Sequence, residues 1–134
     1  MSADAGRVEV ANARFYRVFE RMSLSEMEAV WSHGPHVRCI HPGWRRLEGW
    51  EAVRASWEAI FAGGEEMRFS IGDVHVHVEG GLAWVTCTES ILSETRGTIG
   101  VTTLVATNVF AQERDEWLMV HHHASNVVAG APAP

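Results

Sequence analysis

Lysine is absent from this sequence, because all eleven basic residues among its 134 are arginines. Without a lysine amine, no Schiff base can form with a carbonyl substrate, so that class of mechanism is excluded. Seventeen acidic residues bring the formal net charge to −6. A surface of this sign repels a polyanion, and we therefore expect no nucleic-acid partner.

Cysteine and long apolar runs are also scarce. The two cysteines, Cys39 and Cys87, stand in apolar segments, and no charged-then-apolar leader precedes them. This pattern favours a reduced, cytoplasmic protein. No apolar run approaches the roughly 18 to 20 residues that a membrane-spanning helix needs, so we expect a soluble protein with no membrane partner.

What is present is the composition of a folded domain. Hydrophobic residues make up 46% and charged residues 21% of the chain, which is typical of globular proteins. The length predicts a single domain, which we place at residues 1–126. Residues 127–134 contain only Val, Ala, Gly and Pro without periodicity, and we expect a disordered tail there.

Apolar spacing predicts three helices in the N-terminal half. Residues 5–22 and 50–61 each repeat apolar side chains every three or four positions, which describes one face of a helix. Between them, Ser23 and Glu26 form a capping-box pattern for a second, shorter helix. Gly63 and Gly64 supply the stop after the third.

The period changes to two after Gly64, which predicts strands. We expect them at about 67–78, 82–95, 98–112 and 117–125, after an early short strand at 37–41 that Pro42 ends. A switch in apolar parity at Gly72 and Asp73 indicates a β-bulge in the first long strand. The sequence therefore predicts an α+β fold: three N-terminal helices packed in the concave face of a curved, mostly antiparallel sheet, forming a half-open cone.

This order, together with "HPGW" at 41–44, "LEGWEAVRASWEAIF" at 47–61 and "WLMVHHHAS" at 117–125, resembles the SnoaL-like family. That family belongs to the superfamily of nuclear transport factor 2, ketosteroid isomerase and scytalone dehydratase, and the resemblance covers roughly residues 7–126. It implies the cone-shaped fold and a homodimer formed through the convex face of the sheet. The superfamily contains enzymes, transport adaptors and assembly domains, so the fold alone fixes no activity.

Position by position, the resemblance implies a histidine base. Ketosteroid isomerases have a basic aspartate at the end of the first strand before a proline, and His41 occupies the matching position. Phe15 stands where those enzymes have an oxyanion-binding tyrosine, and Tyr16 points about 100° away on a helix. Polyketide cyclases of the family have an acidic residue late in the sheet, where the three histidines stand here.

Strand alternation separates those three histidines. It predicts that His121 and His123 share a face with Trp117 and that His122 lies on the other face. The resemblance implies that the face with Trp117 is the concave one, so that His122 would face outward. The superfamily places the first strand beside the last, so the base His41 would lie near His121 or His123, each suited to proton transfer near neutral pH. Glu89 falls on a mostly apolar face. We expect it to be partly buried, either as the group that orients a catalytic histidine or in a structural ion pair with Arg38 or Arg54.

Aromatic residues indicate the ligand class. Trp44 follows a Pro-Gly turn at the expected mouth of the cone, where it could stack on a flat ligand. Trp57, Phe15 and Cys39 are further candidate lining residues, although helical spacing also favours Trp57 as a core residue. With no lysine, such a cone fits a small apolar or aromatic molecule, and we expect no cofactor.

Two alternatives to a cofactor-free isomerase, dehydratase or cyclase remain open. The first is a non-catalytic dimeric module for ligand sensing or association, which the small, hydroxyl-rich strand at 98–103 would suit. The second is a metal-dependent enzyme that uses the His75-x-His77 and His121-x-His123 pairs. Two intervening strands would separate those pairs by about 14 Å, and we expect no metal site.

Overall fold

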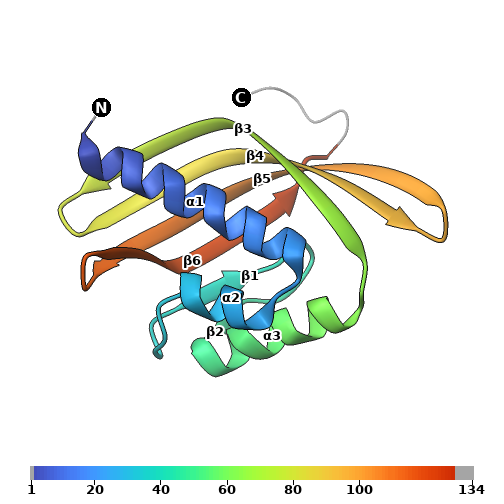
Figure 1. The fold of residues 1–134 in the computed structure, drawn as a ribbon, viewed down its shortest axis with the longest axis horizontal. Helices are drawn as coiled ribbons and strands as arrows, with labels where there is room; N and C mark the ends of the chain where they lie inside the picture. The colour runs from blue at the N-terminus through green and yellow to red at the C-terminus, as the bar shows by residue number, and fades with distance from the viewer. Residues whose placement is uncertain (1, 129–134) are drawn as a thin grey trace.

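The computed structural model describes residues 2–128, and its helices follow the predicted pattern (Figure 1). The three are α1 (Ala3–Arg21), α2 (Leu24–Val30) and α3 (Trp50–Ala62). The predicted cap at Ser23 is confirmed, because its hydroxyl accepts a hydrogen bond from the Glu26 amide. Side-chain caps of this kind satisfy amide groups that have no partner inside the helix.

Six strands form one sheet in the order β2-β1-β6-β5-β4-β3. They are β1 (Arg38–Ile40), β2 (Leu47–Glu48), β3 (Glu66–Glu79), β4 (Leu82–Thr95), β5 (Thr98–Glu113) and β6 (Glu116–Asn126). β1 and β6 pair in parallel, and the other four pairs of neighbouring strands are antiparallel. The α+β prediction is confirmed, as is the placing of the first strand beside the last.

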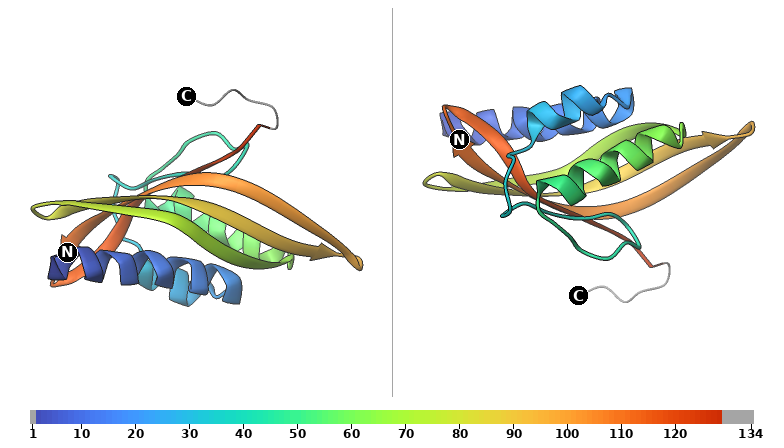
Figure 2. Two further views of the ribbon diagram at one scale, coloured as in Figure 1. Left: turned by 90° about the horizontal axis from the view of Figure 1, so that it is seen from above. Right: turned by 90° about the horizontal axis from the view of Figure 1, so that it is seen from below.

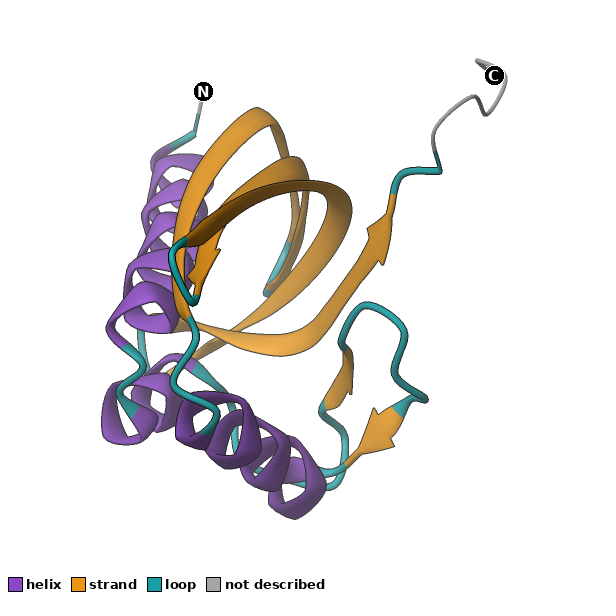
Figure 3. Cartoon of the chain, turned by 90° about the vertical axis from the view of Figure 1, so that its right-hand side faces the viewer, coloured by secondary structure: helices purple, strands orange, loops and turns teal. Residues whose placement is uncertain are grey.

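Two β-bulges accompany the curvature of the sheet, which Figures 2 and 3 show. In β3 the register shifts between Gly72 and His75, as the parity switch predicted, and Asp73 adopts a left-handed backbone with φ of 49°. In β6, Val109 pairs with His121 but Phe110 pairs with Met119, so Val120 is an extra residue. Each bulge bends its strand and increases the local twist, and the sheet curls around the helices.

The core lies between the inner face of the sheet and the helices. The long helix α1 packs mainly along β3, whereas α3 contacts β1 and β2. The largest fully buried side chains come from both layers: Trp31, Trp57, Tyr16, Phe15 and Phe110. This arrangement brings side chains of α1 into contact with the middle of the sheet.

The predicted disordered tail, residues 127–134, lies outside the described residues apart from Val127 and Val128. The amide of Val127 donates to the carbonyl of Thr103 at 3.3 Å. No helix within residues 2–128 is both long enough and apolar enough to cross a membrane.

Candidate acid–base site

The bulge at Val120 changes which histidines face the interior. His122 is 2% exposed and points inward, whereas His121 and His123 pair with Val109 and Thr107 on the outer face. The predicted facing of the three histidines was therefore wrong by one residue. The alternation from Trp117 and Met119 is interrupted at Val120, and the extra residue moves every later side chain to the opposite face.

His41 is buried, with 3% of its surface exposed. Its Nε2 lies 2.9 Å from Oγ of Ser56, and that hydroxyl donates its proton to the carbonyl of Val53 at 2.6 Å. Nε2 of His41 is therefore the donor, which fixes the tautomer. Burial lowers the pKa of His41 to about 4, so the ring is neutral near pH 7. Its nearest histidine ring is His122, at a centroid distance of 6.3 Å, rather than His121 or His123.

Aromatic side chains fill the interior beside His41. Phe15 and Trp57 are fully buried and lie edge to face at 5.7 Å, and the Trp57 ring is 4.8 Å from that of His41. Cys39 is also fully buried, and burial raises the pKa of its thiol. Of the four candidate ligand-binding residues, only Trp44 is exposed, at 44%, with its ring against His41. Ligand contact by these residues stays a prediction.

Tyr16 of α1 and Glu89 of β4 form a close buried pair. The Tyr16 hydroxyl donates to Oε2 of Glu89 at 2.5 Å, and the two residues are 1% and 2% exposed. Burial of Glu89 was expected, but its partner is neither Arg38 nor Arg54, which pair with Glu48 and Glu28. The expectation that Tyr16 points away from the site was wrong, because α1 packs two adjacent positions, 15 and 16, into the core.

Asn108 connects this pair to His122. Its amide nitrogen donates to the Tyr16 hydroxyl at 3.1 Å and to Oδ1 of Asn12 at 2.8 Å. Its amide oxygen lies 2.6 Å from Nδ1 of His122, so this nitrogen carries the proton. The result is a continuous buried network from His122 through Asn108 and Tyr16 to Glu89. Such networks hold their members rigidly in place when each polar group is satisfied.

Burial dominates the electrostatics of this network. It raises the pKa of Glu89 to about 7, with the Tyr16 hydrogen bond acting in the opposite direction. Burial, and then the charge of Glu89, raise the pKa of Tyr16. The pKa of His122 is lowered well below its usual value, mainly by burial. Near neutral pH, Glu89 is the member of the network whose protonation state changes.

An opening between α1 and β3 leads to the network. This cavity, of about 390 Å³, has Asn12 and Tyr16 among its lining residues. The β3 side contributes apolar walls from Phe69, Ile71 and Val74, and Glu9 and Arg17 of α1 also line it. Its β3 wall ends at the bulge. Tyr16 contributes to this lining with 1% of its surface exposed, and Glu89 is not among the lining residues.

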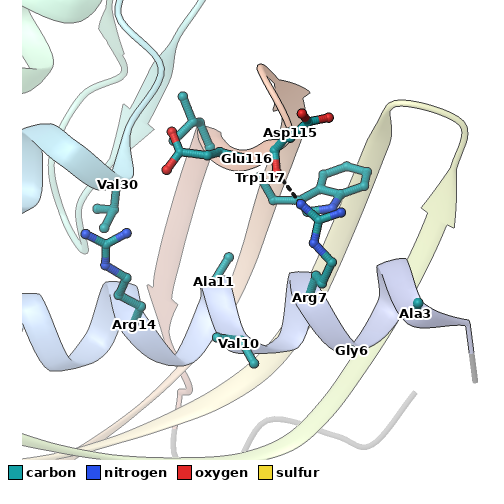
Figure 4. Close-up of a pocket in the computed structure, with 11 residues that line it drawn as sticks. Ala3, Gly6, Arg7, Val10, Ala11, Arg14, Val30, Asp115, Glu116 and Trp117 are labelled. Carbon is teal, nitrogen blue, oxygen red and sulfur yellow. Dashed lines mark hydrogen bonds between the residues drawn. The ribbon is translucent and has the colours of Figure 1, made fainter.

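A second cavity is a surface groove of about 410 Å³ between α1 and the β5–β6 turn (Figure 4). Arg7 crosses one end of it and donates to the carbonyl of Asp115. Arg14, Val30 and Trp117 also line the groove, but Tyr16, Glu89 and His41 do not. We therefore place the candidate acid–base site at the α1–β3 opening.

The two His-x-His pairs do not converge on a metal site. His75 and His77 lie on the edge strand β3, and, as predicted, two strands, β4 and β5, separate them from His121 and His123. Each β3 histidine instead bonds a neighbouring carboxylate, Asp73 or Glu79. Within residues 2–128, no group of three or more His, Cys, Asp or Glu side chains is placed to hold a metal ion.

Sequence reasoning missed several members of the network. The resemblance matched Phe15, and not Tyr16, to the tyrosine of ketosteroid isomerases. Tyr16 nevertheless lies beside the apolar face of its helix, so it could also be buried. Asn12 and Asn108 are also buried. Asn108 has the inward parity of its strand, and Asn12 lies on the buried face of its helix between Val8 and Phe15. A buried amide needs partners, so these two positions were the available signal.

The fold and the buried site together define a cone-shaped α+β domain of the NTF2-like class. A SnoaL-like domain model matches residues 8–130, and the chain belongs to that family. A solved structure from Streptomyces avermitilis, a proposed dehydratase of the NTF2-like family, is 40% identical with a TM-score of 0.87. The match covers 94% of this chain and 97% of the other.

Another similar solved structure belongs to the association-domain group. It is a proposed calcium/calmodulin-dependent protein kinase type II association domain from Thiobacillus denitrificans, 36% identical with a TM-score of 0.80, covering 90% of this chain and 94% of that one. The F-box protein SKIP8 of Arabidopsis thaliana is 29% identical over 114 residues, which is 85% of this chain. The chain spans about half the length of that curated relative, since the match covers 47% of it.

Proposed function

We propose that this protein binds a small apolar or aromatic carbonyl compound in the α1–β3 opening and transfers a proton through the Tyr16–Glu89 pair. The observation that carries the proposal is the 2.5 Å bond between these two groups, one of which, Tyr16, lines the opening. A carboxyl group with a pKa of about 7 is matched to proton transfer near neutral pH. The 40% identity to a proposed dehydratase supports an elimination reaction.

The relay works with Glu89 ionised. The ligand's α-carbon loses its proton to the phenol oxygen of Tyr16 while the phenol's own proton passes to Oε2 of Glu89. The resulting enolate expels its β-hydroxyl group. Return of the proton through Tyr16 to the departing hydroxyl releases water and restores the Glu89 carboxylate. Asn108 donates to the phenol oxygen throughout and fixes its position.

Ligand size and polarity follow from the lining. A cavity of about 390 Å³ lies at the small end of the range for ligand pockets, roughly 300 to 1,000 Å³. Phe69, Ile71 and Val74 favour an apolar or aromatic body, and Asn12 beside Tyr16 offers a polar contact. His41 lines neither of the two cavities described above, so its role as the base stays a prediction and is not needed for this relay.

A panel of aromatic β-hydroxyketones tests the proposal, because their dehydration gives conjugated enones that absorb in the ultraviolet. We expect turnover to rise with pH and to level off above about pH 7. Glu89→Gln and Tyr16→Phe should each lower it by at least about 100-fold, the usual contribution of a positioned acid or base. The outer-face variant His75→Gln serves as the control and should retain full turnover.

Binding of the same compounds, followed by ligand-observed NMR, separates recognition from chemistry. Ala13→Trp places a large side chain in the opening from the exposed side of α1 and should abolish binding, whereas Glu89→Gln should bind as the wild type does. Wild-type turnover that survives in Glu89→Gln would refute the relay. Binding that persists in Ala13→Trp would refute the location.

A second candidate function, a homodimeric association module, is favoured by the outer face of the sheet. That face exposes Trp84 by 40%, Val105 by 47% and Val101 by 71%, and an apolar patch of this kind often marks an interface. The similarity to a proposed association domain supports the same proposal. Sedimentation velocity at pH 8 should show a dimer, and Val105→Glu should shift it to a monomer; a wild-type monomer would contradict this function.

A further inference from the structure

The strand register arranges the outer face in rows of side chains. One row runs His77, Trp84, Val109, His121 and Arg38, from β3 across to β1. The next row runs His75, Thr86, Thr107 and His123. Both rows therefore have a histidine on β3, a histidine on β6, and only uncharged side chains on β4 and β5 between them.

A second copy of this chain is the partner that this face fits best. A hollow of about 350 Å³, lined by Thr86, Thr107, His123 and neighbouring residues, lies on the face, and the exposed Trp84 is on the same strand as Thr86. A surface with both a projection and a hollow can be self-complementary across a two-fold axis. The two rows cover about 300 Å² of sheet at usual spacings, so a stable interface, which buries roughly 800 Å² per partner, would extend along the face to the exposed Val105 and Val101 of β5.

The histidines on β3 and β6 differ in their charged neighbours. Nε2 of His75 lies 2.9 Å from Asp73, and Nε2 of His77 lies 3.0 Å from Glu79. A carboxylate therefore offsets the positive charge when either ring is protonated.

His121 has the opposite environment. Its cross-strand neighbour on β1 is Arg38, which pairs with Glu48 of β2 at 3.5 Å. Its same-face neighbour on β6 is His123, with ring centroids 6.3 Å apart. Asp73 lines the same hollow as His123, but its carboxylate bonds His75 at 2.9 Å, and no ion pair joins a carboxylate to His121 or His123 among residues 2–128. Burial, and then His123 and Arg38, lower the pKa of His121.

We infer that acid reverses self-association through the outer face and that His121 and His123 are the groups responsible. This inference rests on the second proposed function. A dimer across this face would remove these imidazoles from water, which favours their neutral form. Protonation would place four positive charges, two from each copy, in one interface beside two copies of Arg38. The dimer is therefore favoured above the usual imidazole range near pH 6.5 and is lost as the pH falls through it.

Sedimentation velocity of the full chain between pH 8 and pH 5.5 tests the inference, with far-UV circular dichroism confirming that each sample is folded. We expect the dimer dissociation constant to rise at least about 100-fold, because at pH 5.5 each of four buried imidazoles would have to give up a favourable proton. The double variant His121→Asn/His123→Asn should keep the dimer at pH 5.5. The matched variant His75→Asn/His77→Asn should dissociate as the wild type does.

The possible outcomes distinguish a failure of this inference from a failure of the proposed association function. A monomer at pH 8 would contradict the association function itself. A dimer that persists unchanged at pH 5.5, or one that dissociates equally in the His121/His123 variant, would overturn the acid-dependent step and leave the association function standing. If the His75/His77 variant lost the pH dependence, the effect would belong to His75 and His77 rather than to His121 and His123. That result would also overturn the inference.

Discussion

At the residue scale, the site depends on a single carboxyl group in an apolar setting. Glu89 is 2% exposed, and its side chain accepts a hydrogen bond from a phenol, with no cation paired to it among residues 2–128. A cation would hold the pKa low, whereas burial beside a neutral donor raises it to about 7. Parity alone predicted that Glu89 would be buried. Its partner could not be predicted, because partner choice depends on how α1 rotates against the sheet.

Glu89→Gln should change the pH dependence of stability. In the folded protein the pKa of Glu89 lies above its ordinary value of 4.5, so its contribution favours folding at low pH and is lost as the pH rises through about 7. Glutamine has no such dependence and can still accept the Tyr16 hydrogen bond. We expect the free energy of unfolding of the variant, relative to wild type, to increase by about 2 to 3 kcal/mol between pH 5 and pH 8.

Urea unfolding at each pH measures this difference, and Glu94→Gln on the exposed end of β4 is the matched control. A constant difference between Glu89→Gln and wild type across this range would show that Glu89 titrates alike in the folded and unfolded chains.

At the element scale, the helices and one bulge could be predicted, and the other bulge could not. The bulge at Gly72 and Asp73 shifts apolar side chains from one parity to the other, which is visible in the sequence. The bulge at Val120 precedes three identical residues, so no change in hydropathy marks the slip. Strand alternation therefore assigned His121 and His123 to the interior when His122 is there.

The short helix α2 should depend on its cap. Ser23→Ala removes the acceptor for the Glu26 amide, 3.2 Å away, and should lower the free energy of unfolding by about 1 kcal/mol. Ser25, whose hydroxyl accepts from no backbone amide among the described residues, provides the control as Ser25→Ala. Chemical denaturation of both variants makes the comparison. Equal stability of the two would argue against a structural role for the cap.

At the scale of the whole molecule, the order of elements was enough to predict the curved sheet and its helical cover. It was not enough to locate the cavity. The interior beside His41 is filled because Phe15 and Trp57 meet there, and such contacts depend on side-chain size and rotamer rather than on the hydropathy pattern. The opening lies instead between α1 and β3. On the outer face, the strand register places four histidines in two rows. This arrangement could not be predicted from hydropathy.

Titration of the Glu89 carboxyl group by carbon-13 NMR of glutamate-labelled protein, with the resonance assigned by its loss in Glu89→Gln, is the most direct test of the proposed relay. The account predicts a midpoint near pH 7, and a higher one in Tyr16→Phe because the hydrogen bond that favours the carboxylate is gone. A midpoint near the ordinary value of 4.5 would show that the pKa of Glu89 is not matched to proton transfer near neutral pH and would contradict the assignment of this pair as the acid–base site.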